Sequence, residues 1–208
     1  MASSSNKSIK QQNYDYFLVL DFEATCDEER KINPIEIIEF PVLKINARTF
    51  ECESIFHTYV TPTQNPQLTK FCINLTGITQ DMVTNQPKID DVLQNFHSWL
   101  DNEKLLEPNV TFIFVTCGDW DLFTMLPRQC DYFKLHRAGY FNRWINIKKS
   151  FKKATGKFAG GGMMGMLKYF NIQHTGRHHS GIDDCKNIAE ILKQLAERGY
   201  IFEENRKK

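Results

Sequence analysis

The sequence predicts one mixed α/β domain, with a central sheet flanked by helices, and three observations predict it. The chain has 208 residues, which indicates one large domain rather than two, because domains have about 150 residues. Its hydrophobic fraction of 41% and charged fraction of 25% are those of a folded globular chain. Strand-like segments come first and helical segments follow, with one late strand between helices. We expect the domain over residues 15–203, between a disordered N-terminal tail (1–14) and a charged C-terminal tail (204–208).

The predicted strands are apolar or β-rich segments. Residues 16–21 (YFLVLD) form a near-continuous apolar run, which is typical of a strand buried on both faces. Residues 35–45 and 50–61 are rich in β-forming residues and are joined by a short turn, so they predict a hairpin. Pro41 predicts a bulge or a sheet edge, because proline cannot donate to a strand ladder. Residues 110–116 (VTFIFVT) predict a further buried strand.

The pattern becomes helical after Pro62. Apolar residues recur at three- and four-residue spacing in 89–100 and in the last helix, 182–198, which ends at Gly199. The other predicted helices span residues 67–75, 119–126, 146–154 and 163–170. A run of three glycines precedes the helix at 163–170 and predicts a flexible break.

Charge is segregated along the chain although its net value is only +1. Residues 132–182 contain ten Lys and Arg and no Asp or Glu. A surface without carboxylates favours contact with phosphates, because Lys and Arg release counterions when a polyanion binds. A solvated basic face is the alternative interpretation of the same stretch.

The cysteine pattern and the lack of long apolar runs indicate an intracellular protein. Six cysteines occur without a C-x-x-C pair, so we expect buried free thiols in a reducing compartment and no structural zinc. No apolar run approaches the roughly 20 residues that cross a bilayer, and residues 1–14 lack the apolar stretch of a signal peptide. We therefore expect a cytoplasmic or nuclear protein that does not bind membranes.

Two acids end the first apolar strand. Asp21 and Glu23 are two residues apart, and residues with that spacing in a strand project from the same face. Like charges so close raise each other's pKa and destabilise the fold unless a cation lies between them. A solvated acidic cluster at the strand exit is the alternative, although so apolar a strand does not favour it.

Periodicity separates two adjacent acids in the last helix. Asp183 shares its face with polar residues, so it should be solvated or cap the helix. Asp184 shares its face with Ile188, Ile191 and Leu195 and should point inward. An inward carboxylate needs a metal, an arginine or a proton, because burying an unpaired charge is costly.

The segment after the second buried strand offers another acid and leaves a choice open. In Gly118–Asp121 (GDWD), Asp119 is assigned to capping the following helix because it lies nearer the turn, and Asp121 is the better candidate ligand. An oxygen-donor set without cysteine suits Mg²⁺ or Mn²⁺. Two such ions can activate a water and stabilise the leaving oxygen in phosphodiester hydrolysis. A general base is also needed, and His178 and His179 are equal candidates by composition.

Three segments in order resemble the motifs of the DEDDh family of exonucleases. They are Asp21–Cys26 (DFEATC), Gly118–Asp121 (GDWD) and His179–Asp184 (HSGIDD). Four further segments resemble the enhanced-RNAi group of 3′-to-5′ exoribonucleases. They are Ile37–Pro41 (IIEFP), Leu75–Ile78 (LTGI), Trp144–Asn146 (WIN) and Gly176–Asp184 (GRHHSGIDD). The resemblance covers about residues 16–202.

The resemblance implies an RNase H-like fold of the DnaQ-like exonuclease type over residues 15–203. It implies two Mg²⁺ ions, with Mn²⁺ as a substitute, and stepwise release of nucleoside 5′-monophosphates from single-stranded or overhanging RNA 3′ ends. The implied metal ligands are Asp21, Glu23, Asp121 and Asp184. The implied catalytic residues are Glu23 and His179, with His179 as the general base, which selects Asp121 over Asp119 and His179 over His178. His178 stands where the family more often has proline.

The implied nucleotide contacts are Phe22, Ala24, Trp120 and His179, with the rings of Phe22 and Trp120 available to stack on unpaired terminal bases. We expect a monomer that binds RNA. The sequence does not identify a protein partner. Two alternatives differ in class or substrate: a catalytically quiet RNA- or protein-binding module on the same fold, and an exonuclease that acts on DNA.

Overall fold

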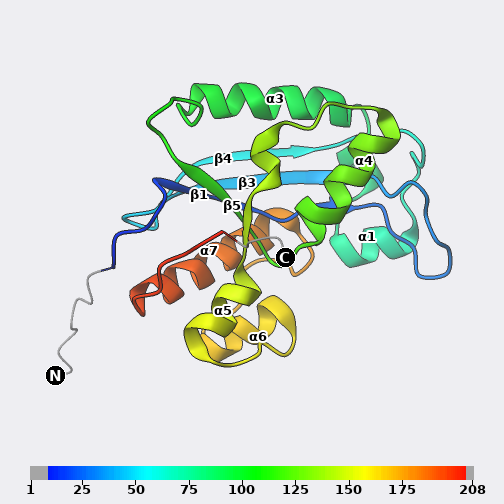
Figure 1. Cartoon of the computed structure of the whole chain (residues 1–208). Helices are drawn as coiled ribbons and strands as arrows, with labels where there is room; N and C mark the ends of the chain where they lie inside the picture. Colours follow the sequence, from blue (N-terminus) through cyan, green and yellow to red (C-terminus); the bar gives the residue numbers. More distant parts are fainter. Residues whose placement is uncertain (1–8, 205–208) are drawn as a thin grey trace.

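The computed structural model describes residues 9–204 and contains a six-stranded mixed sheet (Figure 1). Its strands are β1 (Tyr16–Leu20), β2 (Glu23–Ala24), β3 (Ile37–Asn46), β4 (Cys52–Tyr59), β5 (Phe112–Thr116) and β6 (Trp144–Asn146). Strand β3 pairs antiparallel with β1, β2 and β4, whereas β1 with β5 and β5 with β6 are parallel pairs. The predicted fold class, a central mixed sheet flanked by helices, is confirmed.

Helices cover both faces of this sheet. They are α1 (Lys70–Thr76), α2 (Gln80–Val83), α3 (Ile89–Asn102), the π-helix η1 (Trp120–Met125), α4 (Leu126–Phe133), the 3₁₀-helix η2 (Gly139–Asn142), α5 (Ile147–Thr155), α6 (Gly162–Phe170) and α7 (Gly181–Glu197). In Figure 1, α3 lies above the strands and α5, α6 and α7 lie below them.

Alternate residues of β1 face two separate cores, as expected for a strand buried on both faces. Phe17 and Val19 pack with residues of α5, α6 and α7. Leu18 and Leu20 pack with residues of α3 and α4. All four side chains are fully buried, so β1 is fixed from both sides and the position of its carboxyl end is well determined.

Several details differ from the sequence prediction. The pattern did not predict β2 or β6, which have two and three residues, because so short a strand shows no periodicity. Pro41 lies neither at an edge nor at a bulge, since β3 is paired on both sides. Pro41 lies between Glu39, which is opposite Glu23 of β2, and Val42, which is opposite Leu20 of β1. Proline is tolerated there because the partner strand is interrupted at Asp21 and Phe22.

The expected N-terminal tail is in part a piece of the folded domain. Gln12 donates a hydrogen bond to the Tyr200 carbonyl oxygen at 3.1 Å, and Asn13 donates one to the Phe202 carbonyl oxygen at 3.2 Å. The predicted start at residue 15 is therefore corrected to include residues 9–14. The rest of that tail, residues 1–8, and residues 205–208 of the C-terminal tail lie outside the described residues.

All six cysteines are free. Three of them are buried as expected, but Cys26 and Cys117 are half-buried and Cys52 is exposed because its side of β4 faces solvent. No helix within residues 9–204 has the length and apolar character that crossing a bilayer would require.

Candidate active site

Asp21 and Glu23 lie where one strand gives way to the next. Asp21 directly follows the last residue of β1, and Glu23 begins β2. Glu23 is opposite Glu39 in the pairing of β2 with β3, so a third acid lies beside the pair. The exposed fractions of Glu23 and Glu39 are only 9% and 1%. The end of β1 therefore gathers acidic side chains with little access to water.

Asp121 reaches the same place from the segment after β5. Because β1 and β5 are parallel neighbours, their carboxyl ends lie at one edge of the sheet. Asp121 is the second residue of η1, and a π-helical turn of this kind is frequent at functional sites. The Phe22 backbone N–H donates a hydrogen bond to Asp121 Oδ1 at 3.1 Å, which fixes the 5% exposed carboxylate against the β1 exit.

Asp184 and His179 come from α7 and the loop before it. Asp184 is 3% exposed, as its helical periodicity predicts, and its Oδ2 accepts the His179 backbone N–H at 3.0 Å. His179 has a φ of +65°, a left-handed conformation that few residues other than glycine adopt. Ligand atoms of Glu23, His179 and Asp184 lie within 4.8 Å of one another. A histidine and two acids from separate elements therefore converge.

Glu39 and Gly181 join the start of α7 to the sheet. Glu39 Oε2 accepts the Gly181 N–H at 2.9 Å, and Oε1 accepts the Ile182 N–H at 3.2 Å. A side chain at position 181 would clash, since a Cβ there would lie 2.6 Å from the Asp21 carbonyl oxygen. Glu39 thus positions the helix that carries Asp184. The sequence pattern did not predict this role, and the one available signal was an acid within an otherwise apolar strand.

Burial and mutual repulsion raise the pKa values of the converging acids. Burial, with the neighbouring carboxylates of Asp121 and Glu23 next in effect, raises the pKa of Asp21 well above its usual value. Burial and the Glu39 carboxylate raise the pKa of Glu23 to about 9. Burial raises the pKa of Asp121 to about 6, although the Phe22 N–H opposes this increase. The site therefore carries more negative charge than the protein itself stabilises.

The donor set fits a divalent cation. No Lys or Arg within the described residues forms a salt bridge with Asp21, Glu23 or Asp121. A cation held between these carboxylates and Asp184 would remove the repulsion that raises their pKa values. Because all four side chains offer carboxylate oxygens, the set suits a hard ion that prefers oxygen ligands.

The acids next to Asp121 and Asp184 have other partners. Asp119 occupies the N-cap position of η1, as expected, but its side chain makes no capping hydrogen bond. Its carboxylate instead accepts the Trp144 indole N–H at 2.9 Å and pairs with Lys149 at 2.7 Å, because β6 and α5 pack beside it. Asp183 pairs with Lys186 at 3.0 Å on the partly solvated side of α7. Neither acid therefore belongs to the converging set.

The aromatic residues predicted to stack on bases differ in access. The Phe22 ring is 4% exposed and packs edge-on against Phe40 at a centroid distance of 4.6 Å, so its predicted stacking role is corrected. The ring faces the core because Phe22 continues the alternation of β1, on the same side as Leu18 and Leu20. Trp120 is 44% exposed beside Asp121, and Phe123 on the same π-helix is 62% exposed. Phe123 was missed because nothing in the sequence distinguishes an exposed phenylalanine from a buried one.

The carboxylate-free segment places a cation near the acids. A Cβ on Gly118 would lie 3.4 Å from Lys148 Nζ, and the ammonium group acts against burial to lower the pKa of Asp121. Asn146 caps α5 by accepting the Lys148 and Lys149 N–H groups. This cap fixes where α5 begins and so the position of Lys148 in its first turn. Part of the basic segment thus lies beside the acid cluster, which is formed by Asp21, Glu23, Asp121 and Asp184. Lys149 of the same segment is paired with Asp119.

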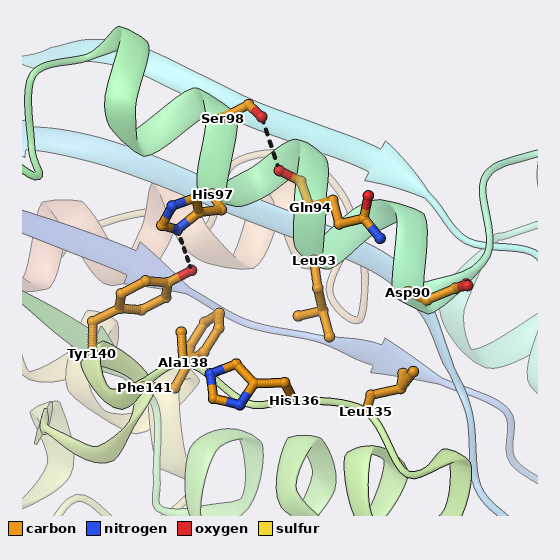
Figure 2. A pocket seen from close by; sticks show the side chains of 10 residues that line it. All are labelled: Asp90, Leu93, Gln94, His97, Ser98, Leu135, His136, Ala138, Tyr140 and Phe141. Atoms are coloured by element: carbon orange, nitrogen blue, oxygen red, sulfur yellow. Dashed lines mark hydrogen bonds between the residues drawn. The ribbon is translucent and has the colours of Figure 1, made fainter.

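A cavity of about 490 Å³ lies elsewhere, between α3 and the segment that follows α4 (Figure 2). Tyr140 and His97 face each other across it with a hydrogen-bond distance of 3.5 Å, and Leu93 points into it. None of the predicted site residues lines this cavity. The chemistry predicted from the motifs therefore belongs to the acid cluster.

Comparison with known proteins finds similar sequences among exonucleases. A family model described as Exonuclease (RNase T) matches residues 18–192. The chain is 57% identical over 200 residues to ERI1 exoribonuclease 3 of Homo sapiens, an alignment that covers 96% of this chain and 59% of that protein. It is 38% identical to 3′-5′ exoribonuclease 1 of Mus musculus, covering 93% of this chain and 56% of that protein. The chain thus spans less than two thirds of the length of these relatives.

A solved structure gives the same likeness. The crystal structure of the nuclease domain of 3′hExo, a DEDDh family member bound to rAMP, superposes with a TM-score of 0.90 and 36% identity. The alignment covers 96% of this chain and 100% of that chain. The architecture is therefore that of DEDDh exonucleases, as the motifs predicted.

Proposed function

The chain belongs to the RNase T family of exonucleases, and on that premise we propose that it is a metal-dependent 3′-to-5′ exoribonuclease. The proposed substrate is a single-stranded or overhanging RNA 3′ end, from which the enzyme releases nucleoside 5′-monophosphates. Relatives over most of the chain are named 3′-5′ exoribonucleases, which supports the direction and the substrate class.

One observation carries this proposal: Asp21, Glu23, Asp121 and Asp184 meet at the carboxyl end of β1, with His179 beside them. Four acids with little access to water and no Lys or Arg partner destabilise a fold, so a purely structural role does not explain why three segments bring them together. A phosphodiesterase has such a reason, because divalent ions must be held against the phosphate.

The four acids would hold two divalent ions, for which we propose Mg²⁺ with Mn²⁺ as a substitute. When bound, such ions supply electrostatic stabilisation of the phosphate and of the departing 3′ oxygen. The residues fit this role in donor type and in charge. Glu23 is central to the set because it lies near His179 as well as near Asp184.

His179 is proposed as the general base. Burial and the neighbouring His178 lower the pKa of His179, so its imidazole is neutral and able to accept a proton near pH 7. It would take the proton of the attacking water, while the cleaved bond leaves a 5′-phosphate on the released nucleotide. The left-handed backbone at His179 sets the direction of the ring.

Nucleotide contacts are proposed for Trp120, Ala24 and His179. The exposed Trp120 ring can stack on an unpaired base, a contact that tolerates any sequence. Ala24 lies next to Glu23 on β2, and its small side chain leaves room for the terminal nucleotide. Lys148 is placed to meet a backbone phosphate near Asp121.

The test uses one RNA labelled at its 3′ end and the same RNA labelled at its 5′ end, each with Mg²⁺. We expect immediate labelled mononucleotide from the first and a ladder of shortening products from the second. Chelation with EDTA should stop both reactions. No mononucleotide from the 3′-labelled RNA, with protein shown to be folded, would contradict the proposal.

Two controls separate the alternatives. A DNA strand of matched sequence, degraded faster than the RNA, would make this a DNA exonuclease. Equal RNA binding by the wild type and by Asp21→Asn, with no turnover by either, would make it a binding module. An intracellular location and a monomeric state are further proposals; the six free cysteines support the location, and light scattering tests the state.

A further inference from the structure

Two histidines outside the proposed catalytic set lie against Asp184. His174 Nε2 is 3.3 Å from Asp184 Oδ1, and His178 Nδ1 is 3.3 Å from Asp184 Oδ2. Ligand atoms of the three residues all lie within 4.8 Å of one another. Asp184 thus belongs to two groups of potential ligands, this one and the group with Glu23 and His179.

These separations are those of ligands around one metal ion. A charge-assisted hydrogen bond between an imidazolium and a carboxylate is shorter, about 2.7–2.9 Å. A tetrahedral Zn²⁺ ion with bonds of about 2.0–2.1 Å places neighbouring ligand atoms roughly 3.3–3.4 Å apart. His174 Nε2 and His178 Nδ1 lie 3.3 and 3.4 Å from the same Asp184 oxygen, Oδ1. Both separations match that edge, so an ion can bind this oxygen and both rings without moving the carboxylate.

Residues outside the acid cluster anchor the loop next to each of the two histidines. The buried Asn187 side chain on α7 accepts the Thr175 N–H at 3.1 Å and donates to the Thr175 carbonyl oxygen at 2.9 Å. The Arg177 N–H donates to Asp183 at 3.0 Å. His174 and His178, one residue from these anchors, are therefore held in place before any ion binds, which lowers the entropic cost of binding.

The donor set differs in chemistry from the four carboxylates. Two imidazole nitrogens and one carboxylate oxygen suit Zn²⁺, whereas an all-oxygen set suits Mg²⁺. The His174 side chain is 13% exposed and that of His178 is 44% exposed, so an ion can enter from solvent at His178. Three protein ligands leave one position of a tetrahedral ion open for water.

We propose that His174, His178 and Asp184 form a zinc site and that zinc competes for Asp184 with the ions of the carboxylate cluster. Zinc binding itself goes beyond the proposed nuclease function, whereas the inhibition that it causes rests on that function. The chain would then be an exoribonuclease that low concentrations of Zn²⁺ switch off in the presence of Mg²⁺.

The binding test titrates Zn²⁺ alone into the full chain against a chromogenic zinc indicator. His174→Asn and His178→Asn should each weaken zinc binding at least tenfold. His136→Asn removes a histidine that lines the distant cavity and should leave zinc binding unchanged. Because the His178 side chain is largely exposed, its variant is expected to fold, and circular dichroism would check both variants. Zinc binding that survives both substitutions but is lost in His179→Asn would overturn the proposal.

The activity test measures RNA degradation at constant Mg²⁺ while Zn²⁺ is varied. In the wild type, zinc should inhibit, and the zinc concentration for half inhibition should rise at least tenfold in His178→Asn. Equal zinc sensitivity of the wild type and of this variant would refute the competition. If no variant degrades RNA, the proposed nuclease function fails, and the indicator titration still decides whether the zinc site exists.

Discussion

Two buried glutamates, 13 residues apart in the sequence, have opposite surroundings. Glu36 precedes β3 and is 1% exposed. Its carboxylate accepts the backbone N–H groups of Thr63, Gln64 and Asn65 at 2.6, 3.0 and 2.8 Å, so its charge is met by donors. Glu23 is 9% exposed, and both burial and the surrounding carboxylates raise its pKa.

Burial of an acid therefore does not identify a functional residue by itself. Glu36 ties the loop after β4 to the sheet, and its donors are fixed by the fold. Glu23 has acids where Glu36 has donors, so its charge is left for a ligand from outside the protein. The distinction predicts that substitutions at the two kinds of acid affect different properties, activity in one case and stability in the other.

The largest expected effect is on activity at the acid cluster. Asp21→Asn should lower the RNA-degrading activity at least about 1000-fold, because the metal loses a charged ligand. The metal-free protein should be as stable as the wild type or more stable, because an amide removes repulsion among the carboxylates. Single-turnover kinetics and thermal unfolding in EDTA measure the two effects. A variant that is active but unstable would reverse the comparison.

The second effect is on stability at the other glutamate. Glu36→Gln should lower the free energy of unfolding by about 2–4 kcal/mol, because hydrogen bonds to a charged group contribute about 1.5–3 kcal/mol each and the new NH₂ group faces backbone donors. Activity per folded molecule should stay within about threefold. Urea unfolding measures the stability, with the exposed Glu29→Gln as the matched control. Unchanged stability would show that the donors around Glu36 are not needed.

The third effect is a pH dependence of stability to which Glu23 should contribute. Its pKa of about 9 in the fold is above its ordinary value of 4.5, so the folded state binds more protons than the unfolded state between these values. Unfolding free energy should therefore fall as pH rises from 6 to 8 in metal-free protein, by about 1–3 kcal/mol relative to Glu23→Gln. Mg²⁺ should stabilise the wild type more at pH 8 than at pH 6. Parallel pH profiles of the wild type and the variant would contradict this account.

The smallest effect is expected at Asp119, the acid next to the cluster that has its own partners. Asp119→Asn should lower the unfolding free energy by at most about 1 kcal/mol, because its pair with Lys149 is exposed to solvent. Activity should stay within about threefold of the wild type. The same unfolding and cleavage assays apply. A loss of activity comparable to that of Asp21→Asn would place Asp119 in the metal-binding set.

Much of the fold was predictable because its signals are local. The apolar run before Asp21 predicted a strand buried on both faces, and Phe17 and Leu18 are buried in separate cores. The three- and four-residue spacing in the last helix placed Asp184 inward and Asp183 outward. Such patterns follow from the period of each element, which the residues of that element set on their own.

Other features escaped prediction because they depend on how elements pair. Strand β6 has three residues and exists through its pairing with β5. Phe22 was expected to meet a base, but its ring lies in the core with Leu18 and Leu20 and packs against Phe40 of β3. Asp119 lies at the N-cap of η1 as expected, but its carboxylate binds Trp144 and Lys149 and not the helix N–H groups.

The sequence by itself determined the fold class, the motifs and the inward direction of Asp184, because period and spacing depend only on neighbouring residues. The tertiary structure decided which groups surround each acid: Glu39 against the start of α7, donors around Glu36, and His174 beside Asp184. Those contacts join residues far apart in the chain. Their electrostatic consequences depend on distances of a few ångströms, which no local pattern records.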